Sequence, residues 1–287
     1  MFSPDTTLIV AAEGWSDAGE AASSAARALI DYYNLQPLHT VDAETYFDFQ
    51  LTRPYVENTP EGQRVLIWPD ITLYGPVAGV SPEDAPFVLL GAEPSRLWRS
   101  LAQEIMDWVL AHGIDAVISL GAMLADVPHS RPVRLLLASD DPIIRSELDI
   151  ERSSYEGPVG ILTVLAMQAT SLDLSALQVW AQVPHYVHTS PSPKATLALL
   201  DKIAELVGVS VPREEWVEQA QQWEHNIDQL AADDDEMTSY IRQLEKARDT
   251  VESPEASGDA IAREFERYLR RGPDRPGTVA GSDSEGL

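Results

Sequence analysis

Short apolar runs alternate with longer helical patterns along most of this 287-residue chain. This alternation is typical of βα units and predicts an α/β fold with a largely parallel sheet. A single large core with an appendage suits the length better than two independent domains do. The expected strands are residues 7–12, 38–41, 65–68, 87–90, 116–120, 133–138 and 177–183, and the expected helices are 20–33, 94–111, 160–170 and 193–207.

The pattern changes after Arg213, where apolar residues recur at steps of four and three on both sides of an acidic break at 233–235. This spacing predicts a helical hairpin at 209–252, appended to an α/β core at 1–208. Its apolar stripe either packs on its own domain, which we favour, or holds another subunit. The remaining segment, 253–287, is expected to be a linker, a short helix at 260–271 and a disordered tail that can be removed without loss of stability.

The charge of the chain excludes several partners. Asp and Glu number 46 against 20 Lys and Arg, and the net charge is −26. Such a chain repels phosphate backbones and anionic lipid headgroups, so we expect no nucleic acid and no membrane partner. The absence of cysteine excludes disulfides and thiolate chemistry and fits a reducing compartment. The N-terminal sequence resembles neither a signal peptide nor a membrane span, so we expect a cytoplasmic protein.

Several candidate site residues follow predicted strands or begin predicted helices. Trp15 and Asp17 lie in a Gly-rich turn before the first helix, where backbone amides can bind an anion or an acid can cap the helix. The glycine spacing matches neither a dinucleotide-binding motif nor a P-loop. Ser16 is a weak candidate nucleophile, because Ala18 stands where a nucleophile elbow needs glycine. Glu93 precedes Pro94 at an expected helix start.

The most distinctive loop is 120–132, which combines an acid, a histidine and an arginine between prolines. His129 can exchange a proton near neutral pH, and Arg131 can hold a carboxylate or phosphate. Glu156 lies before the helix that follows. Six residues are candidates for one site for a small polar or anionic ligand, provided that they meet at the C-terminal edge of the sheet. They are Trp15, Asp17, Glu93, His129, Arg131 and Glu156. Capping and turn roles for each residue remain the alternative, and the spacing predicts no metal site and no cofactor.

Six stretches in this order resemble the bacterial branch of the proteasome assembly chaperone 2 family: GWSDAGEAAS, TYFDFQ, GAEP, LGAMLADVPHSRPV, YEGPVGI and WAQVPHYV with PSPKATLALL. The resemblance covers roughly residues 8–206. It implies a three-layer α/β/α fold of the phosphorylase/hydrolase-like kind shared with nucleoside phosphorylases, in a homo-oligomer for which a trimer is one candidate size. Some members carry an ATP-grasp label, which the few lysines and the missing phosphate loop of this chain do not support.

Two functions remain open at this point. One is a protein-binding, assembly-factor-like role with a protein client. The other is a small-molecule hydrolase or transferase that uses Glu93, His129, Arg131 and Glu156 as acid, base and anion-binding groups. The resemblance supplies no catalytic residues, and the fold alone does not establish a reaction. Enzymatic activity is therefore left undecided.

Overall fold

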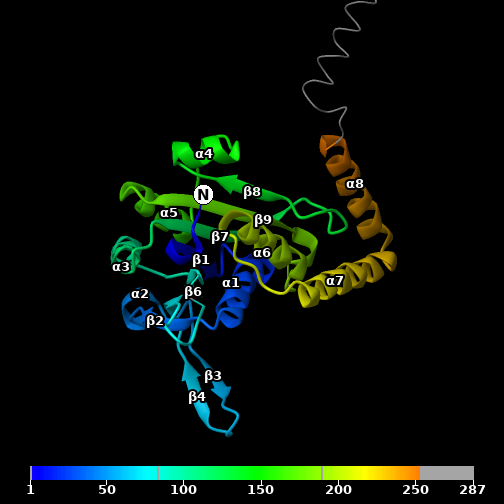
Figure 1. Ribbon diagram of the computed structural model, residues 1–287. Coiled ribbons are helices and arrows are strands. Elements are labelled where there is room, and N and C mark those ends of the chain that lie inside the picture. The colour runs from blue at the N-terminus through cyan, green and yellow to red at the C-terminus, as the bar shows by residue number, and fades with distance from the viewer. Residues whose placement is uncertain (1, 83, 189, 253–287) are drawn as a thin grey trace, which may run out of the picture.

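Seven strands form the central sheet in the order β2-β5-β6-β1-β7-β9-β8, in a computed structural model that describes residues 2–82, 84–188 and 190–252 (Figure 1). The four central strands run parallel, whereas β2, β5 and β8 join the edges in antiparallel orientation. The strands of this sheet are β1 (Thr7–Glu13), β2 (Gln36–Thr40), β5 (Ile71–Gly75), β6 (Phe87–Ala92), β7 (Ala116–Ala125), β8 (Leu135–Ala138) and β9 (Ser175–Pro184).

The apolar run at the start of the chain becomes the buried central strand β1. Ile9 and Ala11 belong to the core on one face of the sheet, whereas Leu8 and Val10 belong to the core on the other face. Alternate side chains of a strand point to opposite faces, so a strand covered on both sides must be apolar throughout. The predicted α/β fold with a mostly parallel sheet is confirmed.

Helices cover both faces of the sheet and complete three layers. One core contains residues of α1 (Ala21–Tyr32) and α6 (Pro193–Val207), and the other contains residues of α3 (Trp98–Ala111) and α5 (Ile161–Ser171). Two short helices, α2 (Ala43–Tyr46) and α4 (Pro142–Leu148), lie in the connections. The sequence pattern did not indicate α4, whose seven residues show too few turns for a helical period to be visible.

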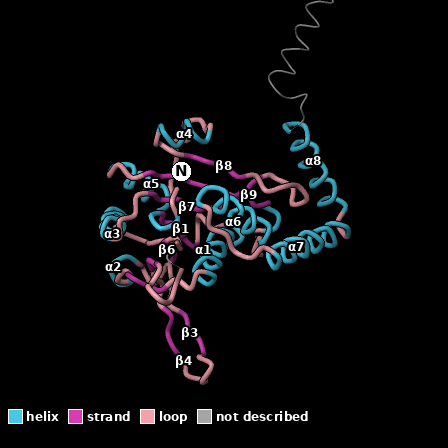
Figure 2. Tube along the Cα trace, viewed as in Figure 1, coloured by secondary structure: helices cyan, strands magenta, loops and turns pink. Residues whose placement is uncertain are grey.

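The strand predicted at 65–68 forms, but it lies outside the central sheet. Residues 65–68 do not join the central sheet, because β4 (Arg64–Ile67) pairs only with β3 (Tyr55–Asn58) in a separate two-stranded hairpin. The sheet position is taken instead by β5, which the sequence pattern missed. Figure 2 shows the β3–β4 hairpin extending away from the body of the molecule.

The C-terminal helices are α7 (Glu214–Ala232) and α8 (Asp235–Glu252), joined by a short acidic turn. Ala220, Ile227 and Ala231 of α7 are buried, and Trp216 packs against the main core, so the apolar stripe of α7 packs on its own domain. Figure 1 shows α8 diverging from α7 instead of lying along it. The expected short helix at 260–271 and the expected tail lie outside the described residues.

Candidate functional site

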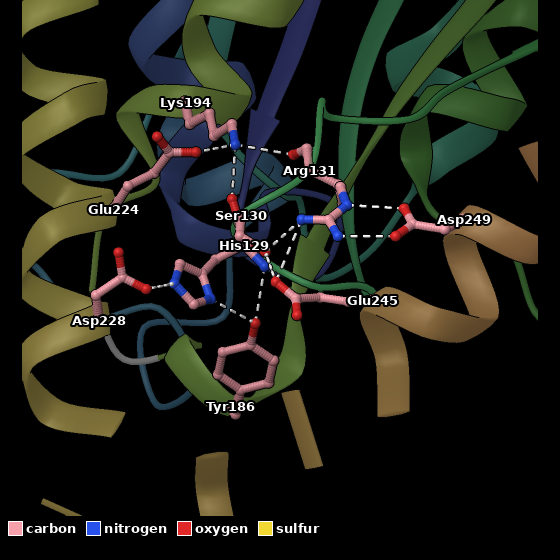
Figure 3. A network of polar contacts seen from close by, with 9 residues as sticks. All are labelled: His129, Ser130, Arg131, Tyr186, Lys194, Glu224, Asp228, Glu245 and Asp249. Atoms are coloured by element: carbon pink, nitrogen blue, oxygen red, sulfur yellow. Dashed lines mark hydrogen bonds and ion pairs between the residues drawn. The ribbon is translucent and has the colours of Figure 1, made fainter. Parts of the chain in front are cut away.

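The loop after β7 is held in place by the C-terminal helices (Figure 3). His129 is only 2% exposed. Its backbone N–H donates to the Tyr186 hydroxyl at 2.8 Å, and its Nδ1 lies 2.9 Å from the same oxygen. Its Nε2 lies 3.0 Å from Asp228 on α7. All three contacts are satisfied when Tyr186 donates to Nδ1 and Nε2–H donates to Asp228.

Tyr186 fits this arrangement because it remains protonated. Burial raises the pKa of the Tyr186 hydroxyl to about 12, so at neutral pH it can donate one hydrogen bond while it accepts another. His129 is thus fixed between a protonated phenol and a carboxylate. This arrangement orients the imidazole as a structural link between the loop, the segment after β9 and α7.

Arg131 is held by two acids of α8. Its Nε and Nη2 donate to the two oxygens of Asp249, each at 2.8 Å, and its Nη1 lies 3.3 Å from Glu245. Ser130 donates to the same Glu245 oxygen at 2.5 Å. The bidentate contact with the Arg131 guanidinium holds the pKa of Asp249 below its usual range. The fork that could have gripped a ligand anion is therefore occupied by the chain itself.

Lys194, at the start of α6, closes the same loop from its other side. Its ammonium donates to the carbonyl oxygens of His129 at 2.6 Å and of Arg131 at 2.8 Å, and it forms an ion pair with Glu224 of α7. The adjacent cavity, whose lining includes His129, Arg131, Lys194 and Trp223, has a volume of about 10 Å³. That is space for about one water molecule, far below the several hundred Å³ of an ordinary ligand pocket.

A second group of the candidate residues meets at the start of α5. Glu93 Oε1 accepts from the Ile161 N–H at 3.0 Å and so caps α5. A Cβ at Gly160 would lie 2.8 Å from Glu93 Oε1, 2.8 Å from Ser16 Oγ and 3.1 Å from the Trp15 ring. Ser16 is 1% exposed, and its hydroxyl has no hydrogen-bond partner among the described residues, whereas Trp15 is 64% exposed.

The six predicted residues are therefore distributed over different contacts. Trp15 and Glu93 both lie against Gly160. His129 and Arg131 both belong to the loop after β7, where they bind acids of α7 and α8. No hydrogen bond or ion pair in the described ranges joins these two groups. Asp17 accepts from the N–H groups of Ala22 and Ser23 and caps α1, with its pKa raised by burial. Glu156 is exposed on the segment before α5.

Glu93 differs from its expected local role. The sequence predicts a helix that begins at Pro94 and places Glu93 at its start. In the structure α3 begins at Trp98, and Glu93 caps α5 instead, which lies 68 positions further along the chain. Side chains at a shared sheet edge can reach the neighbouring helix as easily as their own.

Sequence reasoning missed the partners that close the loop. They are Tyr186, Lys194 and four acids of the C-terminal helices, Glu224, Asp228, Glu245 and Asp249. One signal was available: each helix carries two of these acids four positions apart, which places both on one helix face. Among the residues that the structure describes, no cluster of three or more potential metal ligands is present, and no helix is long and apolar enough to cross a membrane.

Fold and site together define a three-layer α/β/α protein whose distinctive strand-end loop is clamped by its own C-terminal helices. The PAC2 family model matches residues 11–231, so the chain belongs to the PAC2 family, as its motifs predict. The match extends beyond residue 208 into α7.

Several solved structures resemble this one over most of their length. A PAC2 family protein from Streptomyces avermitilis is 39% identical, with 82% of this chain and 99% of that chain covered at a TM-score of 0.73. A proteasome-assembly chaperone homologue from Mycobacterium tuberculosis is 34% identical, with the same coverage and TM-score. Pyrococcus furiosus PbaA, an archaeal homologue of proteasome-assembly chaperone, shares the fold at 17% identity and a TM-score of 0.57, with 86% of this chain and 97% of that chain covered. A search of the curated proteins finds no match.

Proposed function

We propose that this protein is a cytoplasmic assembly factor that binds protein clients as a homo-oligomer. Its similarity to a proteasome-assembly chaperone homologue makes proteasome subunits the first client to test. The observation that carries the proposal is the closed loop: His129, Arg131 and Lys194 all bind groups of the same chain. An α/β enzyme would bind a small ligand at such a strand-end loop, but here these three groups are engaged by the chain itself.

The client test uses the full-length protein and unassembled proteasome subunits of the same organism. Sedimentation velocity of the mixture should show a complex that neither component forms alone, and subunit assembly should proceed faster with the protein present. An unrelated protein of similar acidity controls for charge. Absence of a complex, together with unchanged assembly kinetics, would reject these subunits as the client.

The homo-oligomer is tested separately by light scattering on the purified full-length chain. We expect a mass that is a multiple of 31.5 kDa, with a trimer as the first size to compare. A monomer mass at every micromolar concentration would refute the oligomer while leaving client binding to be decided by the first experiment.

One observation favours the second candidate, a small-molecule hydrolase or transferase. The Ser16 hydroxyl is buried beside Glu93 and the start of α5 with no hydrogen-bond partner in residues 2–82, 84–188 and 190–252, and such groups are uncommon in folded proteins. A panel of chromogenic carboxylic and phosphate esters tests it with wild type, Ser16→Ala and, as a control, Ser100→Ala on the exposed surface of α3. Turnover that only Ser16→Ala abolishes would support an enzyme, and turnover that survives in all three would exclude a role for Ser16.

A further inference from the structure

The β3–β4 hairpin is an arm whose two strands pair only with each other among the residues that the structure describes. It forms a separate sheet of two four-residue strands, and it projects from the body (Figure 1). At its base the Trp68 ring packs on Phe49, with ring centroids 4.9 Å apart, which anchors the arm to the body. Isolated two-stranded hairpins are marginally stable in water, so an extended one gains stability when its face is covered.

One face of the arm is apolar and carries a cation. Val56 and Leu66 are directly paired across the two strands, and directly paired residues point to the same face. They are 47% and 55% exposed. The next pair on this face, two positions along, is Asn58 and Arg64. The Arg64 guanidinium has no ion-pair partner within the described ranges.

The charge of the arm differs from that of the whole chain. Residues 51–68 contain two arginines and two glutamates, so their net charge is zero, whereas the chain carries −26. A neutral segment with an unpaired arginine can approach an acidic surface that would repel the rest of the molecule. A second copy of this chain presents such a surface.

Two exposed aromatic side chains lie near the segment that leads into α5. Trp15 is 64% exposed and Tyr155 is 65% exposed, and both flank the Gly160 segment: the Trp15 ring lies next to Gly160, and Tyr155 donates to the Pro158 carbonyl at 2.9 Å. Glu156 is exposed beside Tyr155. Tryptophan and tyrosine side chains are enriched at protein interfaces, and the adjacent acid offers a partner for a cation.

We propose that the arm of one copy docks on the Trp15–Tyr155 patch of a second copy, with Val56 and Leu66 against the aromatic rings and Arg64 paired with Glu156. This inference rests on the proposed homo-oligomer and names its interface. Because arm and patch are different surfaces, the contact is heterologous, and repetition of it closes a ring when the rotation permits. In this arrangement Trp15 and Glu156 bind a neighbouring subunit and no small ligand.

A charge-reversal cycle tests the contact by light scattering over a range of micromolar concentrations. Arg64→Glu and Glu156→Arg should each weaken self-association about tenfold or more, and the double variant should restore most of it. Leu66→Ser should also dissociate the oligomer. Arg99→Glu, an equal charge change on exposed α3, should leave the mass unchanged. Circular dichroism verifies that each variant is folded, and Arg64→Glu decides the matter if Leu66→Ser fails to fold.

The possible outcomes separate the interface from the oligomer itself. A monomeric wild type would overturn both proposals. An oligomer that persists unchanged in Arg64→Glu and Glu156→Arg would overturn the arm contact and leave the homo-oligomer standing. Loss of client binding in Arg64→Glu without any change of mass would show that the arm holds the client, which also rejects its docking on a second copy.

Discussion

The polar side chains of the loop at 120–132 form their hydrogen bonds with other groups of the same chain. His129 joins Tyr186 to Asp228, and Arg131 joins the loop to Asp249. These residue types match those of many ligand sites, but their partners are already present in the folded protein. Arg64 on the arm has no such partner in the part of the chain that the structure describes, and this contrast distinguishes a structural arginine from one available for binding.

His129→Ala should destabilise the protein by about 2 kcal/mol, because it leaves the half-buried Tyr186 hydroxyl with one hydrogen bond fewer and opens a small cavity. Chemical denaturation measures the free energy of unfolding. His225→Ala on the exposed surface of α7 is the matched control and should change it little. Equal stability of the two variants would show that His129 does not hold the loop.

Elements of the sheet edge are fixed by side chains from other segments. Glu93 follows β6 and caps α5, whereas Asp17 follows β1 and caps α1. At the opposite end of the sheet, His39 of β2 and His112 after α3 bring their Nε2 atoms to 3.0 Å. In each case one or two side-chain hydrogen bonds link a strand, or the residues just after it, to a helix or its end.

Glu93→Ala should remove the cap of α5 and lower the free energy of unfolding by about 1 kcal/mol, the usual value for a lost N-terminal cap. Glu93→Gln keeps a side-chain oxygen that can accept from the Ile161 N–H and should retain most of that stability. The two variants are compared by urea denaturation. An equal loss in both would mean that the negative charge matters more than the acceptor.

The histidine pair predicts a loss of stability in mild acid. Burial, and then the neighbouring His39, lowers the pKa of His112 from 6.5. Between that lowered pKa and 6.5 the unfolded chain binds more protons than the folded chain, so the free energy of unfolding falls as the pH drops below 6.5. His112→Asn should make this fall shallower when stability is measured against pH, whereas His225→Asn should not.

On the scale of the whole molecule, the net charge of −26 opposes compaction as well as association. The ion pairs between the loop region and the C-terminal helices offset part of this repulsion locally, because they place Arg131 and Lys194 among the acids of α7 and α8. The C-terminal helices, which are rich in acids, are thereby held on the core by the few cations of the loop region.

Added salt should raise the melting temperature of the protein. An increase in ionic strength from about 0.01 M to about 0.1 M shortens the Debye length from about 30 Å to about 10 Å, which screens repulsion across the molecule more than it weakens ion pairs in contact. Calorimetry in sodium chloride measures the effect. A melting temperature that falls with salt would mean that the ion pairs of the clamp outweigh the net repulsion.

The core and the family could be predicted from the sequence because both depend on local patterns. A strand buried on both faces must be apolar, so β1, β7 and β9 were visible as apolar runs, and amphipathic spacing revealed α6 and α7. The ordered motifs were sufficient to identify the PAC2 family. The hairpin β3–β4 was only half visible, because every residue of β3 is exposed, whereas exposed and half-buried positions alternate along β4.

The tertiary structure alone decided which residues of the candidate site are available. Arg131 meets Asp249 across 118 positions of sequence, and Glu93 meets the start of α5 across 68. Residue type and spacing determine what a side chain can bind, and here they correctly placed charged groups after the strands. Which partner each group finds depends on how distant segments pack, and a side chain engaged by such a segment has fewer hydrogen bonds left for a ligand.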